Sequence, residues 1–89
     1  METAQVRQKR MTMRSWRRGT KEMDLVLGPF AQTHLAGMSE AELQLYDELL
    51  DENDQDLITW VMGTGAIPGR FAALVAQISG FARERLEKI

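Results

Sequence analysis

The stretch that decides the fold is FAALVAQISGFARERL, residues 71–86, close to the end of an 89-residue chain. Its apolar residues recur every three or four positions and therefore share one face of a helix. They are Phe71, Leu74, Val75, Ile78, Phe81, Ala82 and Leu86. This stripe predicts an amphipathic helix from about Pro68 to Lys88, packed against a core that the rest of the chain supplies.

Two more helices are predicted in the middle of the chain. Ser39 and Glu42 stand three residues apart and form a capping box, so a helix starts there. Asp54 or Asn53 caps a shorter helix that follows. The apolar faces hold Leu43, Tyr46, Leu49 and Leu50 in the first helix, and Leu57, Ile58, Trp60 and Val61 in the second. The segment GTGAIPG, residues 63–69, ends the second helix and leads to the last one.

The N-terminal part predicts a further pair of helices, separated at Gly19. The first runs from about Thr3 to Arg18 and ends because glycine readily takes the left-handed conformation that closes helices. Its sparse apolar positions are Val6, Met13 and Trp16. The second starts at about Thr20, and its apolar face holds Met23, Val26, Leu27, Phe30 and His34. Pro29 falls inside this pattern and should kink the helix or mark an early turn.

No segment alternates apolar and polar residues for long enough to predict a strand. Five short helices with brief connections predict an all-α protein, a compact five-helix bundle. We expect residues 1–89 to form a single small domain in which residues 1–7 are a frayed N-terminus.

Composition excludes several classes of function. The chain has no cysteine, which excludes disulfides, zinc-thiolate sites and thiol catalysis. His34 is the only histidine, and no nucleophile or orienting acid stands at a helical spacing from it. So small a chain is also poorly suited to a deep, dry active site. We therefore expect no enzyme, no bound metal and a structural role for His34.

Neither a signal peptide nor an apolar run of the roughly 20 residues that span a bilayer is recognisable. We therefore expect a cytoplasmic, bacterial-type location and no membrane insertion.

Charge is distributed very unevenly. Between Met1 and Glu22 the chain carries seven basic residues: Arg7, Lys9, Arg10, Arg14, Arg17, Arg18 and Lys21. Ten acidic residues follow from Glu22 to Gly69, with no lysine or arginine among them. The basic arm can contact a partner protein, or it can neutralise the acidic middle within the molecule. Nucleic-acid binding is disfavoured because the acidic middle repels phosphates.

Two segments resemble a phosphate-binding loop and a calcium loop, but both lack residues that these sites require. Residues 63–69 lack the lysine and the preceding strand of a phosphate-binding loop. The acidic segment 51–56 lacks both the glycine and the final bidentate acid of a calcium loop. We interpret the first as a helix connection and the second as a solvated turn.

One segment carries a resemblance. Residues 17–22 read RRGTKE, which contains the pattern Arg-Gly-x-x-Glu, and MDL at 23–25 and Pro29-Phe30 follow. Further along come LYDELL at 45–50 and DLITW at 56–60. In this order and spacing, over roughly residues 8 to 86, the chain resembles the flavinylation factors of succinate dehydrogenase, called SdhE in bacteria and assembly factor 2 in mitochondria.

The resemblance implies a non-enzymatic assembly factor, a FAD chaperone for respiratory complex II. Such a factor binds the flavoprotein subunit of succinate dehydrogenase, with fumarate reductase left open as a second client. It promotes covalent attachment of FAD to a histidine of that subunit. FAD is then the cofactor of the client, and we expect no cofactor bound stably by this chain, with direct FAD binding left open. We also expect a monomer.

The resemblance also implies which residues dock on the partner. The motif carries over to Arg18, Gly19 and Glu22, which would face the flavin site of the partner. Trp16, Arg17, Asp24, Pro29 and Phe30 match the family less sharply and are expected to be flanking contacts or support for them. Tyr46, Asp47 and Trp60 match the family pattern too, but core and capping roles explain them equally well.

Two alternative functions stay open from the sequence. One is a regulatory protein-interaction module, antitoxin-like or an adaptor, that uses the same basic face. The other is a small nucleic-acid-binding helical protein.

Overall fold

A computed structural model describes residues 2–87, with side chains as far as residue 85. Five α-helices and two short 3-10 helices follow one another, and the described residues form no strand. Their bounds are α1 (Ala4–Trp16), α2 (Lys21–His34), η1 (Leu35–Gly37), α3 (Glu40–Leu49), α4 (Asp54–Met62), η2 (Gly69–Phe71) and α5 (Ala72–Glu87). The predicted all-α, five-helix architecture is confirmed. None of these helices is long and apolar enough to cross a membrane.

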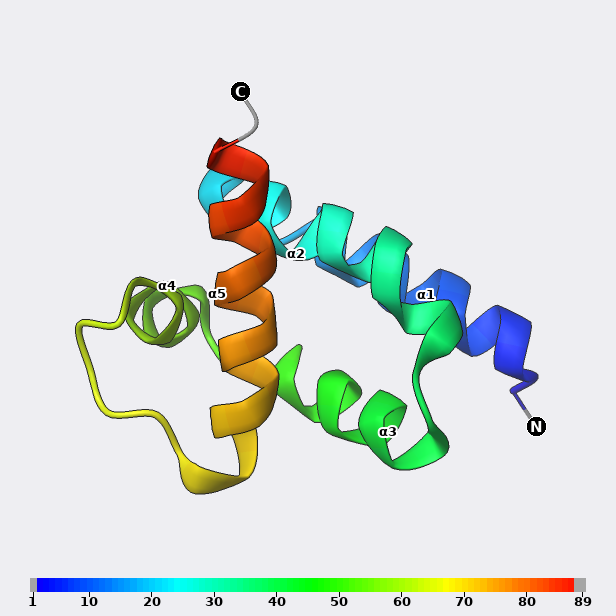
Figure 1. The fold of residues 1–89 in the computed structure, drawn as a ribbon. Helices are drawn as coiled ribbons and strands as arrows, with labels where there is room; N and C mark the ends of the chain where they lie inside the picture. Colours follow the sequence, from blue (N-terminus) through cyan, green and yellow to red (C-terminus); the bar gives the residue numbers. More distant parts are fainter. Residues whose placement is uncertain (1, 88–89) are drawn as a thin grey trace.

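The helices enclose one core (Figure 1). α1 and α2 lie side by side as an antiparallel pair, and this is the most extensive helix contact of the fold. α5 stands upright against α2 and α4, and α3 lies below the α1–α2 pair. The α1–α2 turn and the α3–α4 turn are thereby brought close together, although more than thirty residues separate them in the sequence.

Side-chain caps set the helix starts. Thr3, Thr20, Ser39 and Asn53 each accept a hydrogen bond from a backbone N–H in the first turn of the helix that follows. Ser39 and Glu42 form the predicted capping box, and the Ser39 N–H lowers the pKa of the Glu42 carboxyl. Asn53 rather than Asp54 caps α4, which leaves the Asp54 carboxylate available for another contact.

Helix α4 ends at Gly63, whose φ of 76° is the only positive φ among the described residues. Glycine is favoured there because it has no Cβ. Gly19 does not share this conformation, and α1 already ends at Trp16. The prediction that Gly19 closes the first helix in the left-handed conformation is therefore wrong.

Pro29 lies inside α2, which continues to His34 without an early turn. Proline has no N–H, so it cannot donate to the carbonyl of Leu25 one turn earlier. The Nη1 atom of Arg85, on α5, lies 3.2 Å from that carbonyl oxygen and donates to it instead. A neighbouring helix thus satisfies the acceptor that the proline leaves unpaired.

The core draws on every helix, and its fully buried members include Met11, Phe30, Tyr46, Leu57 and Phe71. For the last four helices the predicted apolar faces supply these residues. For α1 only part of the prediction holds: the Trp16 ring packs on α2, but Val6 and Met13 are 52% and 50% exposed, and the fully buried Met11 was not predicted.

The α1–α2 contact depends on Gly28. A Cβ atom at this position would lie 2.3 Å from the indole ring of Trp16, well inside van der Waals contact. Only glycine therefore lets the Trp16 ring lie directly on the α2 backbone.

His34 packs among aromatic rings. It stacks on Phe30 with a centroid distance of 4.3 Å and meets Phe81 edge to face at 5.0 Å. Its Nδ1 atom lies 3.3 Å from the Phe30 carbonyl oxygen. The contacts are those of the structural histidine that we expected.

Tyr46 provides a pH-dependent part of the stability. Ser15 donates to the Met11 carbonyl at 2.8 Å, so its one hydroxyl proton is used, and the Tyr46 hydroxyl donates to Ser15 at 2.6 Å. Burial raises the pKa of Tyr46 to about 12. In the unfolded chain a tyrosine ionises near pH ~10. The native state therefore holds this proton at a pH where the unfolded state has lost it.

We expect the free energy of unfolding to fall by about 2–3 kcal/mol as the pH rises from ~10 to ~12. Urea unfolding at several pH values measures this loss. The Tyr46→Phe variant is the control, since it cannot ionise and keeps the Ser15–Met11 bond. Equal alkaline losses in the two proteins would contradict this account.

Candidate docking site

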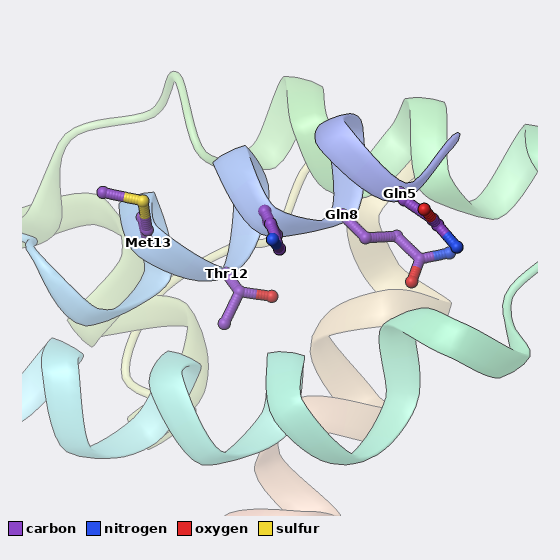
Figure 2. Close-up of a pocket in the computed structure, with 5 residues that line it drawn as sticks. Gln5, Gln8, Thr12 and Met13 are labelled. Carbon is purple, nitrogen blue, oxygen red and sulfur yellow. The ribbon is translucent and has the colours of Figure 1, made fainter. Parts of the chain in front are cut away.

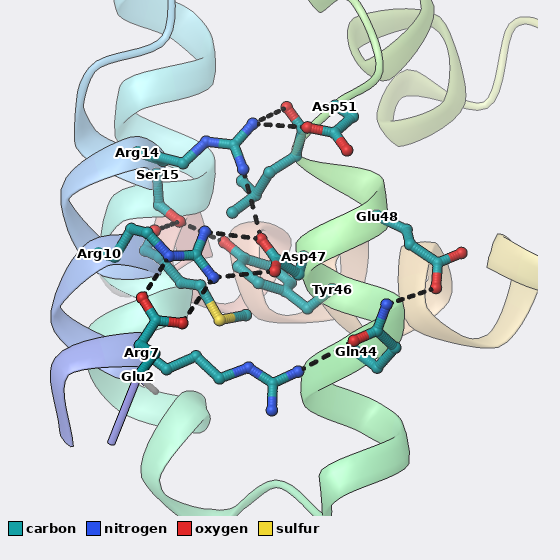
Figure 3. Close-up of polar contacts among 12 residues, drawn as sticks. Glu2, Arg7, Arg10, Arg14, Ser15, Gln44, Tyr46, Asp47, Glu48 and Asp51 are labelled. Carbon is teal, nitrogen blue, oxygen red and sulfur yellow. Dashed lines mark hydrogen bonds and ion pairs between the residues drawn. The ribbon is translucent and has the colours of Figure 1, made fainter. Parts of the chain in front are cut away.

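The arginines of α1 face the acidic residues of α3 (Figure 3). Arg7, Arg10 and Arg14 stand three and four residues apart, so they share one side of the helix. Arg10 contacts both carboxylate oxygens of Asp47, at 3.1 and 3.0 Å. Its guanidinium holds the pKa of that carboxyl below the usual range.

The row continues at both ends. Arg7 pairs with Glu40, and Arg14 bonds to Asp51 at 2.8 Å and also to Asp47. The basic arm is thus neutralised largely within the molecule, which was one of the two roles that the sequence left open. The side chains of Lys9, Arg17 and Lys21 are exposed and make no hydrogen bond or ion pair with another described residue.

Arg18 extends the row into the turn between α1 and α2. Its Nε donates to Asp54 Oδ1 at 2.9 Å, and its Nη2 donates to the Glu52 carbonyl at 2.6 Å. The remaining Nη1 donates to the carbonyl of Leu50. The Arg18 and Asp54 side chains are only 10% and 15% exposed, so this ion pair is well shielded from water. The α1–α2 turn is thereby fastened to the α3–α4 turn.

Two carboxylates fix the backbone of the same turn. The Arg18 N–H donates to Asp24 Oδ1 at 2.6 Å, and the Gly19 N–H donates to Asp54 Oδ2 at 2.9 Å. Asp54 therefore holds a side chain and a backbone group at once. We call Arg18, Asp24 and Asp54 the clamp.

The predicted partner-binding residues fall into three groups, two of which lie at this turn. Arg17, Gly19 and Glu22 are exposed and lie together at the turn, and Lys21 is exposed beside them. We call these four residues the exposed junction. Arg18 and Asp24 lie in the clamp beneath it.

Pro29 and Phe30 lie apart from the turn. Both are buried in α2, where Phe30 is part of the core and fully enclosed. In this conformation neither side chain is available to a partner, although their role as flanking contacts stays a prediction.

Sequence reasoning missed the role of Asp54 and assigned it only as a possible helix cap. The sequence held a clue to this role. Asparagine is a preferred N-cap residue, so Asn53 can cap α4 and the Asp54 carboxylate is not needed for capping. Its partner, 36 residues earlier, could not be read from the sequence.

Among the described residues no group of three or more histidine, aspartate or glutamate side chains could hold a metal ion. The exposed junction consists of charged side chains and an accessible backbone, and the clamp orders the turn beneath it. Such an arrangement is suited to binding another protein.

Several curated proteins similar to this chain share one name. Proteins from Meyerozyma guilliermondii and Candida glabrata are both named "Succinate dehydrogenase assembly factor 2, mitochondrial". The first is 42% identical over 59 residues, covering 66% of this chain and 44% of the relative. The second is 35% identical over 85 residues, covering 90% and 56%. The chain thus spans about half the length of these relatives.

The relatives correct one expectation. Each of these proteins is named as mitochondrial, and so is a third, from Debaryomyces hansenii, which is 44% identical over 59 residues. This finding contradicts the expected cytoplasmic, bacterial-type location. That expectation rested on the lack of a recognisable targeting segment, which is weak evidence for any compartment.

The family comparison covers the site as well as the fold. The model described as "Flavinator of succinate dehydrogenase" matches residues 9–82, which include the clamp and the exposed junction. Both the resemblance read from the RRGTKE segment and the named relatives agree with this match. The chain belongs to the family of succinate dehydrogenase flavinators, also named assembly factor 2.

Proposed function

We propose that this chain binds the flavoprotein subunit of succinate dehydrogenase and promotes covalent attachment of FAD to it, without acting as an enzyme. The exposed junction docks on the partner, and the clamp holds the junction in shape before docking. The family description and the relatives' names support the assignment.

Gly19 carries this proposal. The glycine is exposed, and its φ lies in the range open to any residue. A Cβ atom at this position would meet nothing closer than Asp54 Oδ2 at 3.4 Å, an ordinary contact. The fold does not require a glycine here, in contrast to Gly28. Close approach by a second protein's backbone is a physical reason for a glycine at such a place.

Preorganisation is the proposed mechanism. Attachment of the flavin is chemistry of the flavin and of a histidine in the partner. The assembly factor has only to favour the conformation of the partner in which these groups meet. Arg17, Lys21 and Glu22 place both signs of charge around Gly19, which fixes the register of docking. The clamp lowers the entropy lost on docking, because the turn is already ordered.

The nucleic-acid alternative loses its main support. It depended on a free basic arm, but Arg7, Arg10, Arg14 and Arg18 are paired with acidic residues of α3 and α4. Too few unpaired cations are left to follow a phosphate backbone.

Deletion of the gene in its native cells tests the proposal. We expect covalent flavin on the flavoprotein subunit, measured by fluorescence in a denaturing gel, to disappear and to return when the gene is restored. Undiminished fluorescence in the deletion strain would contradict the proposal. The same gel, applied to the flavoprotein subunit of fumarate reductase, decides whether that enzyme is a second client.

A further inference from the structure

The outer face of α1 points away from the core and is unusual in composition. Val6, Lys9 and Met13 stand at intervals of three and four residues, so they lie along one side of the helix. The two apolar side chains are half exposed, and they are two of the sparse apolar positions that the sequence pattern assigned to this helix. We call these three residues the outer stripe.

The stripe is also part of a surface hollow. Lys9 and Met13 line a shallow, open depression together with Gln5, Gln8 and Thr12. Figure 2 shows Gln5, Gln8, Thr12 and Met13 projecting from successive turns of α1. The outer side of α1 is therefore an uneven surface of mixed apolar, polar and charged side chains.

The outer face of α1 differs from the rest of the helix in how its charged side chains are paired. α1 contains no acidic residue, and its arginines face α3. Lys9 makes no ion pair with another described residue, and neither does Arg17, which follows the end of α1 at the exposed junction. The unpaired charge along this side of α1 is therefore positive and continues to the junction.

We propose that the outer stripe is a second contact with the same flavoprotein subunit, and that it meets an acidic surface with an apolar centre. The inference rests on the proposed function, since it extends the interface from the exposed junction along α1. Unpaired cations complement carboxylates, and Val6 and Met13 supply apolar area that a small junction lacks. Methionine suits this role because its flexible side chain adapts to irregular surfaces.

An anionic membrane is the competing occupant for a basic and apolar helix face. Stable attachment to a bilayer needs a broad apolar face rich in aromatic or leucine side chains. The stripe offers only one valine and one methionine, so a protein partner fits it better.

Affinity measurements with the purified flavoprotein subunit test the inference. Lys9→Glu is expected to weaken binding by about tenfold at low salt and by less at high salt, because the lost term is electrostatic. Met13→Ser is expected to weaken binding equally at both salt concentrations. Arg83→Glu, the same change at an exposed cation of α5, is the matched control and should bind like the unmodified chain.

The outcomes are distinguishable. If Lys9→Glu and Met13→Ser bind as tightly as Arg83→Glu, the outer stripe is no contact and this inference is overturned. If the unmodified chain itself fails to bind, the proposed function is overturned instead.

Vesicles of phosphatidylglycerol form a separate arm. Vesicle capture that Lys9→Glu abolishes, with flavoprotein affinity unchanged, would assign the stripe to a membrane and overturn the inference. Circular dichroism confirms that each variant is folded.

Discussion

Replacement of Gly19 by tryptophan is expected to reduce covalent flavin attachment to the level seen without the chain, while the protein keeps its helical content. The fold tolerates a Cβ here, whose nearest neighbour would be Asp54 Oδ2 at 3.4 Å. A large side chain on the exposed junction would hold the partner away. Loss of a central contact of this kind costs about 2 kcal/mol or more of binding energy. Gel fluorescence of the flavoprotein and circular dichroism of the variant measure the two effects.

Gly37 offers a matched control for this substitution. It is also an exposed glycine without positive φ, and a Cβ atom there would meet nothing within 4 Å. Gly37→Trp should therefore leave flavin attachment intact. An active Gly19→Trp protein, or equal losses in the two variants, would remove the exposed junction from the docking site.

Replacement of Asp54 by alanine is expected to lower the free energy of unfolding by about 2–3 kcal/mol. The change leaves the shielded Arg18 guanidinium without its carboxylate and the Gly19 N–H without its acceptor. The junction should then sample several conformations. Flavin attachment should therefore fall even at temperatures where the variant is fully folded, because the ordering energy must come from docking.

Asp56→Ala is the control for the clamp. Asp56 also lies in the first turn of α4, but among the described side chains its exposed carboxylate accepts only from Asn53 and does not contact Arg18. Its loss should cost under about 1 kcal/mol. Urea unfolding compares the two variants. If Asp54→Ala is no less stable than Asp56→Ala, the clamp does not order the turn in the way described here.

Most helices could be predicted because their signals are local. A capping box at Ser39 and a regular apolar stripe from Phe71 to Ile78 depend on residues within a few turns, and the structure confirms both. Pro29 could not be interpreted in the same way. The helix continues through the proline, and the carbonyl that the proline leaves unpaired accepts a hydrogen bond from Arg85 on α5, at the other end of the chain.

The orientation of α1 was missed for a different reason. Hydrophobic periodicity assumes that a helix turns its apolar side inward, but α1 turns a row of arginines toward the acids of α3. Met11 lies in the core beneath them and Trp16 packs on α2, whereas Val6 and Met13 are half exposed. A row of basic residues at helical spacing, opposite a later row of acidic ones, was the available clue.

The candidate site was half predictable. The segment from Arg17 to Glu22 stood out by its resemblance to a family, and the structure brings its residues together at one turn. Which of these residues are exposed and which are held in the clamp could not be predicted from the sequence. Arg18 belongs to the motif and was therefore predicted to contact the partner. In the structure, however, its guanidinium donates to Asp54 and to two carbonyls of the α3–α4 turn.

The most direct test of the central claim uses purified components. The flavoprotein subunit, produced without bound flavin, is mixed with FAD, and covalent flavin is followed in time by gel fluorescence with and without this chain. We expect the chain to accelerate attachment, the effect to saturate as the flavoprotein becomes fully bound, and Gly19→Trp to give no acceleration. An attachment rate that is the same with and without the unmodified chain would contradict this claim.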